Sequence, residues 1–188
     1  MDEDVVYCKH PTVQQLSSQI SSTYEDLFLT GIGSDVVFLV GEEKIPAHKA
    51  VISARVPYLG KMMSSGMEEA QTGTIKIKDA EPPIFKQVLR HVYCGKLPED
   101  LKTNALQILP YADKFDLPSL REACIHWMER GLDVSNVIET LTAADLFRCD
   151  DLKRKCLERL NEWKASMDAA EFERLEPRLL IELIKVRA

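Results

Sequence analysis

The sequence predicts an α+β protein in which a small sheet comes first and a long helical region follows. Segments with the alternating or densely apolar pattern of strands occur only before residue 80. From Pro82 onward, apolar residues recur at steps of three and four, which is the spacing along one face of a helix. These two observations favour a small β-sheet flanked by α-helices, with an all-helical C-terminal extension.

An apolar stripe near the start of the chain predicts a first helix of about fifteen residues. Its members recur at steps of three and four and are Val13, Leu16, Ile20, Tyr24 and Leu27. Gly31 and Gly33 are expected to end this helix, because glycine commonly follows a helix C-terminus.

Three later segments predict the strands of the sheet. The apolar run 35–40 has the composition of a buried strand, and a turn at Gly41 leads to a second strand at 44–47. These two strands are expected to form a hairpin. Residues 74–78 alternate between apolar and polar side chains and predict the third strand.

Helices are expected in most of the remaining chain, with proline at several starts and glycine at several ends. The expected helices are 48–56, 57–64, 82–94, 106–115 with a bend at Pro110, 118–131, one capped by Ser135, one from its cap Asp150 to Trp163, and 177–186. A boundary is expected between residues 131 and 134.

Composition limits the classes of function. The 188 residues include 24 Lys and Arg against 30 Asp and Glu, and the net charge of −6 argues against broad binding of nucleic acid or anionic membranes. The five cysteines form no C-x-x-C pair, and no apolar leader opens the chain. We therefore expect free thiols in the cytoplasm or nucleus, and no membrane span.

Motifs for catalysis or metal binding are incomplete. Gly31-Ile-Gly33 lacks the third glycine of a dinucleotide loop, and Cys8-Lys-His10 and Cys124-Ile-His126 each lack a second ligand pair for zinc. His48 could be a general base, but no nucleophile stands at a recognisable spacing. A polar residue held by its neighbours is the simpler interpretation, and we expect neither cofactor nor metal.

An acidic pair beside methionines, in the sequence SSGMEEA, stands out as a surface feature. Gly66 and the serines indicate a loop, and methionine is common on protein-binding surfaces. A docking surface at Met67, Glu68 and Glu69 is therefore favoured over a piece of core.

Several motifs in one order resemble the signature of the BTB/POZ domain. They are DVVF from Asp35, IPAHKAVISARVPY from Ile45, MEE from Met67, DAEPPIFKQVLRHVYCGKLP from Asp79 and ILPYADKFDLPSLREACIHWM from Ile108. The resemblance covers about residues 13–131, and residues 132–163 resemble the three-box or the start of a BACK domain of speckle-type POZ and kelch-like adaptors. It implies an N-terminal tail at 1–11, a BTB/POZ domain at 12–131 and a helical three-box/BACK-like segment at 132–188.

The resemblance implies a non-enzymatic homodimer that docks the N-terminal domain of cullin three as an adaptor of a RING E3 ubiquitin ligase. Members that bind cullin carry a hydrophobic-x-Glu motif, which Met67 and Glu69 match here. The other wall of the docking groove is expected from Tyr58, Met62 and Met63, where methionine at position 63 departs from the usual aromatic residue.

The resemblance also assigns the first helix and a polar cluster to the dimer. The stripe from Val13 to Leu27 matches the dimerisation helix of the family, although it could instead cover the sheet of its own protomer. Asp35 and Lys49, beside His48, are expected to form a buried polar cluster near the dimer axis. The alternative for these residues is a pair of exposed loop charges.

A second function stays open at this point, namely a transcriptional or scaffolding BTB dimer that binds co-regulator peptides between its protomers without cullin. An enzyme is a third, less favoured class. No kelch, MATH or ankyrin pattern is evident, so a substrate protein is expected to be bound by a domain not present in this chain.

Overall fold

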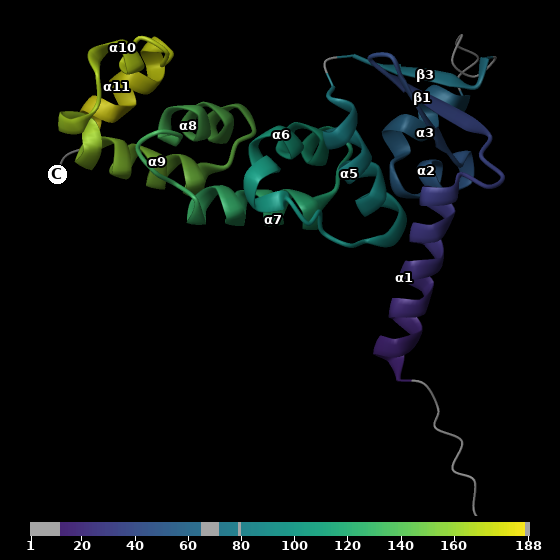
Figure 1. The fold of residues 1–188 in the computed structure, drawn as a ribbon. Coiled ribbons are helices and arrows are strands. Elements are labelled where there is room, and N and C mark those ends of the chain that lie inside the picture. Colours follow the sequence, from purple (N-terminus) through teal and green to yellow (C-terminus); the bar gives the residue numbers. More distant parts are fainter. Residues whose placement is uncertain (1–11, 65–71, 79, 187–188) are drawn as a thin grey trace, which may run out of the picture. The chain divides into compact units, whose positions relative to one another are not determined.

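The computed structural model describes residues 12–64, 72–78 and 80–186 (Figure 1). The chain divides into two compact units, which are residues 1–79 with 89–96 (unit 1) and residues 80–88 with 97–188 (unit 2). Strands occur in unit 1, and the described part of unit 2 is helical. A small sheet with a helical extension is therefore confirmed, whereas the division into 12–131 and 132–188 stays a prediction.

The sheet of unit 1 has three strands in the order β2-β1-β3, with β1 at Val36–Val40, β2 at Glu43–Ala47 and β3 at Thr74–Ile77. β1 pairs antiparallel with β2, as the predicted hairpin requires, and parallel with β3. Side chains alternate between the two faces of a sheet. One face is buried and carries Val36, Phe38, Val40, Ile45, Ala47 and Ile75.

Capping interactions fix both ends of α1 (Val13–Thr30). The Thr12 hydroxyl accepts a hydrogen bond from the backbone of Gln15, and the Gln15 side chain accepts one from the backbone of Thr12, which is a capping box. Gly31 follows with a left-handed φ of 63° and ends the helix. The helix has 18 residues, slightly more than predicted, because it continues to this glycine.

Two short helices follow β2 and cross at close range. They are α2 (Lys49–Arg55) and α3 (Pro57–Ser64). A Cβ atom at Gly60 of α3 would lie 3.1 Å from the Cα atom of Ser53 in α2. The absence of a side chain at Gly60 therefore allows the two helices to approach.

The remaining helices follow the predicted order with two differences. They are α5 (Pro82–Cys94), α6 (Leu101–Lys114), α7 (Pro118–Arg130), α8 (Val137–Leu146), α9 (Asp150–Trp163), the 3₁₀ turn η1 (Lys164–Ser166), α10 (Ala169–Phe172) and α11 (Pro177–Lys185). α6 begins earlier than predicted and continues through Pro110, and the sequence did not predict the short α10. Residues of α5 belong to both units.

Two predicted caps are wrong by one or more positions. The cap position of α8 is Asn136 and not Ser135, whose backbone and hydroxyl instead donate hydrogen bonds to the carboxylate of Asp133 in the turn before the helix. Asp150 is the first residue of α9, and Cys149 precedes it as the cap position. Short polar residues cluster at both starts, which makes the capping position ambiguous in the sequence.

Ion pairs connect α11 to the helices before it in unit 2. Lys153 of α9 contacts Asp145 at 2.9 Å and Glu182 of α11 at 2.7 Å. Arg178 of α11 also contacts Asp145, and the apolar Leu183 of the same helix is buried. The C-terminal helix is thus part of the packed unit.

Candidate protein-interaction surfaces

The first helix carries an apolar surface that its own chain leaves largely open. Four of the five stripe residues are exposed and Leu27 is half-buried. Ile20, near the middle of the stripe, is 61% exposed. Figure 1 shows the first turns of α1 extending away from the sheet of unit 1. The stripe therefore does not cover the sheet of its own protomer, which was the alternative from sequence.

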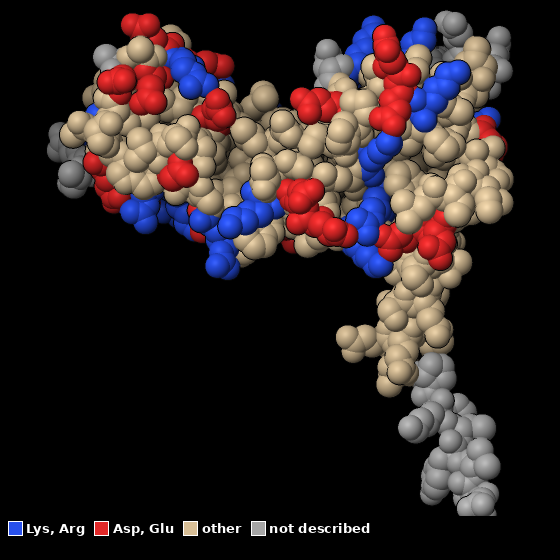
Figure 2. All heavy atoms as spheres, in the orientation of Figure 1, with Lys and Arg blue, Asp and Glu red and all other residues tan. Residues whose placement is uncertain are grey.

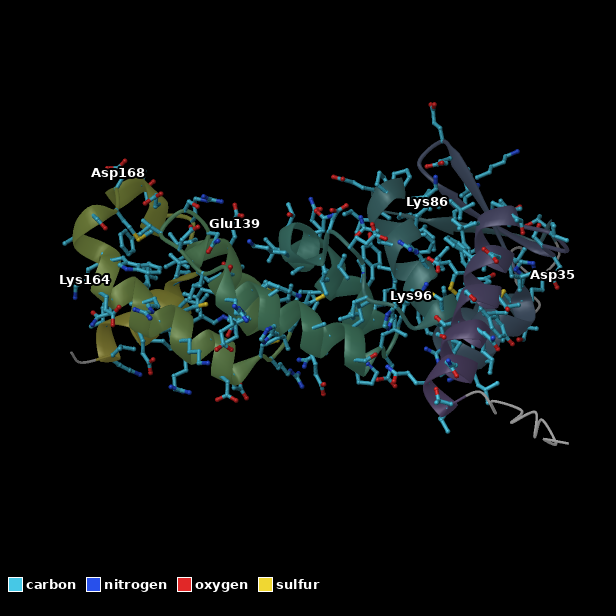
Figure 3. All side chains as sticks on the ribbon, turned by 60° about the horizontal axis from the view of Figure 1, so that its bottom comes forward. Asp35, Lys86, Lys96, Glu139, Lys164 and Asp168 are labelled. Carbon is cyan, nitrogen blue, oxygen red and sulfur yellow. The ribbon has the colours of Figure 1, made fainter. Side chains whose placement is uncertain are left out.

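A charge cluster around the buried Glu25 connects α1 to the end of α5. Glu25, on the side of α1 that packs, accepts hydrogen bonds from Lys96 Nζ and Arg90 Nε, each at 2.5 Å. Figure 3 labels Lys96 beside α1. The hydrogen bond from Lys96 and then that from Arg90 hold the pKa of Glu25 below its usual value. The charge of Glu25 is thus compensated, and these contacts join α1 to the end of α5.

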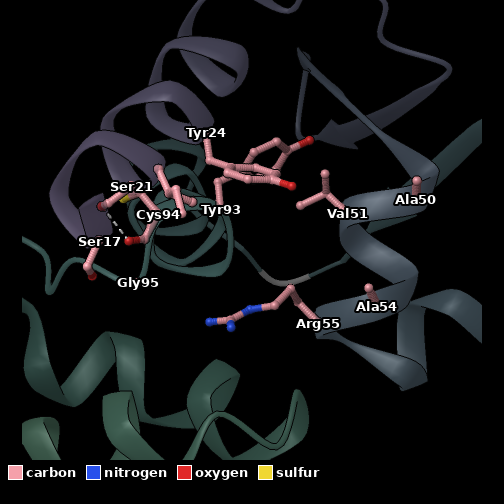
Figure 4. Close-up of a pocket in the computed structure, with 11 residues that line it drawn as sticks. Ser17, Ser21, Tyr24, Ala50, Val51, Ala54, Arg55, Tyr93, Cys94 and Gly95 are labelled. Atoms are coloured by element: carbon pink, nitrogen blue, oxygen red, sulfur yellow. Dashed lines mark hydrogen bonds between the residues drawn. The ribbon is translucent and has the colours of Figure 1, made fainter. Parts of the chain in front are cut away.

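A cavity of about 460 Å³ opens beside the stripe in unit 1 (Figure 4). Its lining comes from α1, α2 and the end of α5, and it is called here the α1–α2 groove. The residues that line it are Ser17, Ile20, Ser21, Tyr24, Ala50, Val51, Ala54, Arg55, Tyr93, Cys94 and Gly95. Ser21 Oγ donates to the carbonyl oxygen of Cys94 at 2.7 Å, the dashed line in Figure 4, and so closes one end. Ile20 and Tyr24 belong to both stripe and groove, so the two form one surface.

Of the expected polar cluster at the start of α2, Asp35 and Lys49 are joined by one hydrogen bond, and Asp35 is not buried within one chain. Asp35 Oδ1 accepts a hydrogen bond of 2.7 Å from the backbone N–H of Lys49. Asp35 is exposed, and His48 and Lys49 are half-buried. Asp35 thus satisfies a free N–H in the first turn of α2, where a carboxylate is favourable. The expectation that these residues are buried is therefore wrong for the single protomer.

His48 is held on both sides of its ring. Tyr93 Oη lies 2.8 Å from His48 Nδ1 and also accepts the backbone N–H of His48 at 2.8 Å, while His48 Nε2 lies 2.9 Å from the carbonyl oxygen of Ile32. Since a carbonyl oxygen can only accept, Nε2 is the donor in the contact to Ile32. Burial raises the pKa of Tyr93 to about 12, so its hydroxyl stays protonated. The contacts support the scaffold interpretation of His48.

The expected cullin-docking residues are only partly described. Met67 and Glu69 lie outside the described residues. Tyr58 of α3 is 45% exposed and Met62 is half-buried, so both reach the surface. Met63 is only 8% exposed, which corrects its placement in a groove wall. Leu59 and Met63, one helical turn apart, form the buried face of α3 instead.

A second groove, in unit 2, has no counterpart among the residues singled out from the sequence. It has a volume of about 410 Å³ and is called here the α6–α8 groove. Its lining residues are Leu106, Pro110, Ile138, Glu139, Thr142, Ala143, Leu146, Phe147 and Arg174. Leu146 is 67% exposed, and Arg174 contacts Glu139 at 2.7 Å on the rim. The sequence could have indicated this groove through apolar residues, such as Leu146, that lie outside the buried stripe of their helix.

The described residues contain neither a cluster suited to a metal ion nor a helix suited to a membrane span. No group of three or more His, Cys, Asp or Glu side chains there could hold a metal ion. Cys124 is fully buried and its pKa is raised to about 12 by burial, whereas His126 is exposed. Cys8 and His10 lie outside the described residues. Within the same part of the chain, no helix is long and apolar enough to span a membrane.

Comparison with known proteins defines the class of protein. The family model of the BTB/POZ domain matches residues 24–132, which is more than half of the chain. The chain therefore belongs to the BTB/POZ domain family, whose members are in general non-enzymatic modules for dimerisation and protein binding.

The matched region makes up only about half of each of two curated relatives. The mouse TD and POZ domain-containing protein 1 is 29% identical over 170 residues, which are 85% of this chain and 47% of that protein. The mouse TD and POZ domain-containing protein 5 is 29% identical over 169 residues, 84% of this chain and 50% of that protein. The chain thus spans about half the length of these curated relatives.

A solved structure supports the fold. The BTB domain of zebrafish PATZ1 superposes with a TM-score of 0.52 at 24% identity, over 65% of this chain and 98% of that one. At this level of identity the similarity concerns the fold. The α+β BTB/POZ fold predicted from the sequence is therefore confirmed.

Proposed function

We propose that the protein is a homodimeric adaptor that docks the N-terminal domain of cullin three in a RING E3 ubiquitin ligase. The observation that carries the proposal is the open apolar surface of α1 and the α1–α2 groove, in a chain whose family serves protein interaction. The hydrophobic-x-Glu motif at Met67 and Glu69 supports cullin as the partner.

The dimer would form through the stripe of α1. Four exposed apolar side chains on one helix face are costly in water, and a second copy with the same face would cover them. The lining of the adjacent α1–α2 groove includes the small residues Ser17, Ala50 and Ala54, which leave room for side chains from the partner. Permanent interfaces of this kind bury ~2,000 Å² or more.

Cullin docking would centre on α3 and the residues after it. Tyr58 is an exposed aromatic residue at the start of α3, and aromatic residues are common anchors at interfaces. Met67 would enter an apolar pocket of the cullin helices, and Glu69 would hydrogen-bond near it. Anchors of this type contribute ~2 kcal/mol or more each, while charges at the rim contribute little.

The helical region after Val134 would lengthen the docking surface. The α6–α8 groove offers an apolar binding surface in that region, with Leu146 as its most open side chain. Deletion of residues 134–188 should therefore weaken binding, but it would also remove the buried Val137 and Leu141 from unit 2. The exposed Leu146 allows a milder test by Leu146→Ser.

Binding of a co-regulator peptide is the competing function, and the α1–α2 groove is the observation that favours it. This groove has both apolar side chains and the cation Arg55, so it could hold a peptide without cullin. As an adaptor, the protein would bind its substrate protein through a region outside this chain. In either case, it would act in the cytoplasm or nucleus.

Calorimetric titration against the purified cullin-three N-terminal domain tests the proposal. The wild-type chain should bind one cullin domain per protomer. Met67→Ala and Glu69→Ala should each weaken binding at least about tenfold, because ~1.4 kcal/mol corresponds to a factor of ten. Leu146→Ser should have a smaller effect. Absence of heat from the wild type, or equal affinity of wild type and Met67→Ala, would contradict the adaptor function.

A further inference from the structure

The central strand β1 is apolar on both faces, although one of these faces is only partly covered in the described chain. Val36, Phe38 and Val40 are buried, and the alternating Val37 and Leu39 on the other face are half-buried. Uninterrupted apolar strands are typical of sheets covered on both faces, whereas a sheet with one face in water normally alternates. The composition of β1 therefore suggests a second covering layer.

The strand register defines this partly covered surface, called here the outer sheet face. Val37 lies between Pro46 of β2 and Thr74 of β3, and Leu39 lies between Lys44 and Lys76. Neighbouring strands are about 4.8 Å apart, so the two lysines begin about 10 Å from each other, on either side of an apolar centre. This width is similar to the diameter of one α-helix, about 10 Å.

The charge of the outer sheet face indicates the kind of partner. Lys44 and Lys76 are exposed, and neither forms an ion pair within the described residues. Glu43, on the same hairpin, belongs by alternation to the opposite face. Figure 2 shows Lys and Arg atoms, with some acidic atoms beside them, where Figure 1 places β1 and β3. A second copy of the same face would bring lysines against lysines and is disfavoured.

We propose that the outer sheet face binds an acidic amphipathic helix of a partner protein. The apolar stripe of that helix would lie on Val37 and Leu39, as helices generally cover an apolar sheet face. Carboxylates on both sides of the stripe would pair with Lys44 and Lys76. The residues of this face do not belong to the α1 stripe or to the set expected to dock cullin, so the proposal does not depend on the function proposed above.

Binding of a designed peptide tests the proposal. The probe is a fluorescent helical peptide of about 15 residues, with leucines along one face and glutamates on both sides of them. The matched peptide has glutamine at every glutamate position. Fluorescence anisotropy with the full chain should show saturable binding of the acidic peptide that weakens as salt is added, and at least about tenfold weaker binding of the glutamine peptide.

Charge-reversal variants locate the site. Lys44→Glu with Lys76→Glu should weaken binding of the acidic peptide at least about tenfold. Lys102→Glu with Lys185→Glu changes the net charge by the same amount at exposed positions elsewhere and should change affinity less than about threefold. Carbodiimide cross-linking should join peptide carboxylates to Lys44 or Lys76. The proposal is overturned if the acidic peptide does not bind, if both double variants weaken it equally, or if the cross-links form at other lysines.

Discussion

Replacement of Ile20 by alanine should weaken the homodimer strongly. Ile20 is 61% exposed in the single chain, and that part of its side chain is available for burial by a partner. Burial of a whole isoleucine side chain contributes about 1.5–3 kcal/mol, which gives about 1–2 kcal/mol per protomer. The change occurs twice in an isologous interface, and about 2–4 kcal/mol corresponds to roughly 30- to 700-fold in the dissociation constant.

Leu29→Ala is the matched control for this prediction. Leu29 is on the same helix and is 68% exposed, but it lies on the opposite face from the stripe. Sedimentation velocity over a dilution series should show Ile20→Ala dissociating at concentrations where the wild type and Leu29→Ala stay dimeric. If both variants dissociate alike, or if the wild type sediments as a 21.3 kDa species, the stripe is not the dimer interface.

Two further predictions concern buried titratable residues of unit 1. Lys96 and Arg90 hold the pKa of Glu25 below 4.5, so the contribution of Glu25 to stability is present above that pH and is lost as the pH falls further. Urea unfolding should therefore show a difference in stability between wild type and Glu25→Gln at neutral pH, and the two should converge in acid. A difference that stays constant with pH would contradict this prediction. Burial holds the pKa of His91 below 6.5, so the unfolded chain takes up its proton first, and stability should fall as the pH drops below about 6.5. The loss between about pH 7.5 and about pH 5.5 should be smaller in His91→Gln, and an equal loss would refute the assignment.

Local patterns were sufficient to predict most of the fold. The strands around Gly41 and the helix before Gly31 follow from alternation, helical spacing and glycine at the ends, which are properties of neighbouring residues. The exposed stripe of α1 was also correctly located, because an apolar helix face is visible in the sequence whether it meets its own chain or another one.

Features that depend on distant contacts were not predictable. Glu25 and its ion-pair partner Arg90 are 65 residues apart in the sequence, so no local pattern indicates this pair. Met63 was expected at the surface together with Met62. Which side chains of a short helix become buried depends on the side of that helix against which the rest of the protein packs. The i, i+4 relation of Leu59 and Met63 would have favoured the buried face.

The mass of the complex with the cullin-three N-terminal domain tests dimerisation and docking together. Light scattering coupled to size exclusion, on a mixture with excess cullin domain, should give the mass of two 21.3 kDa chains plus two cullin domains. Met67→Ala should shift this species toward the mass of the dimer alone. A complex with one chain and one cullin domain, or a mass that does not change when cullin is added, would contradict the account.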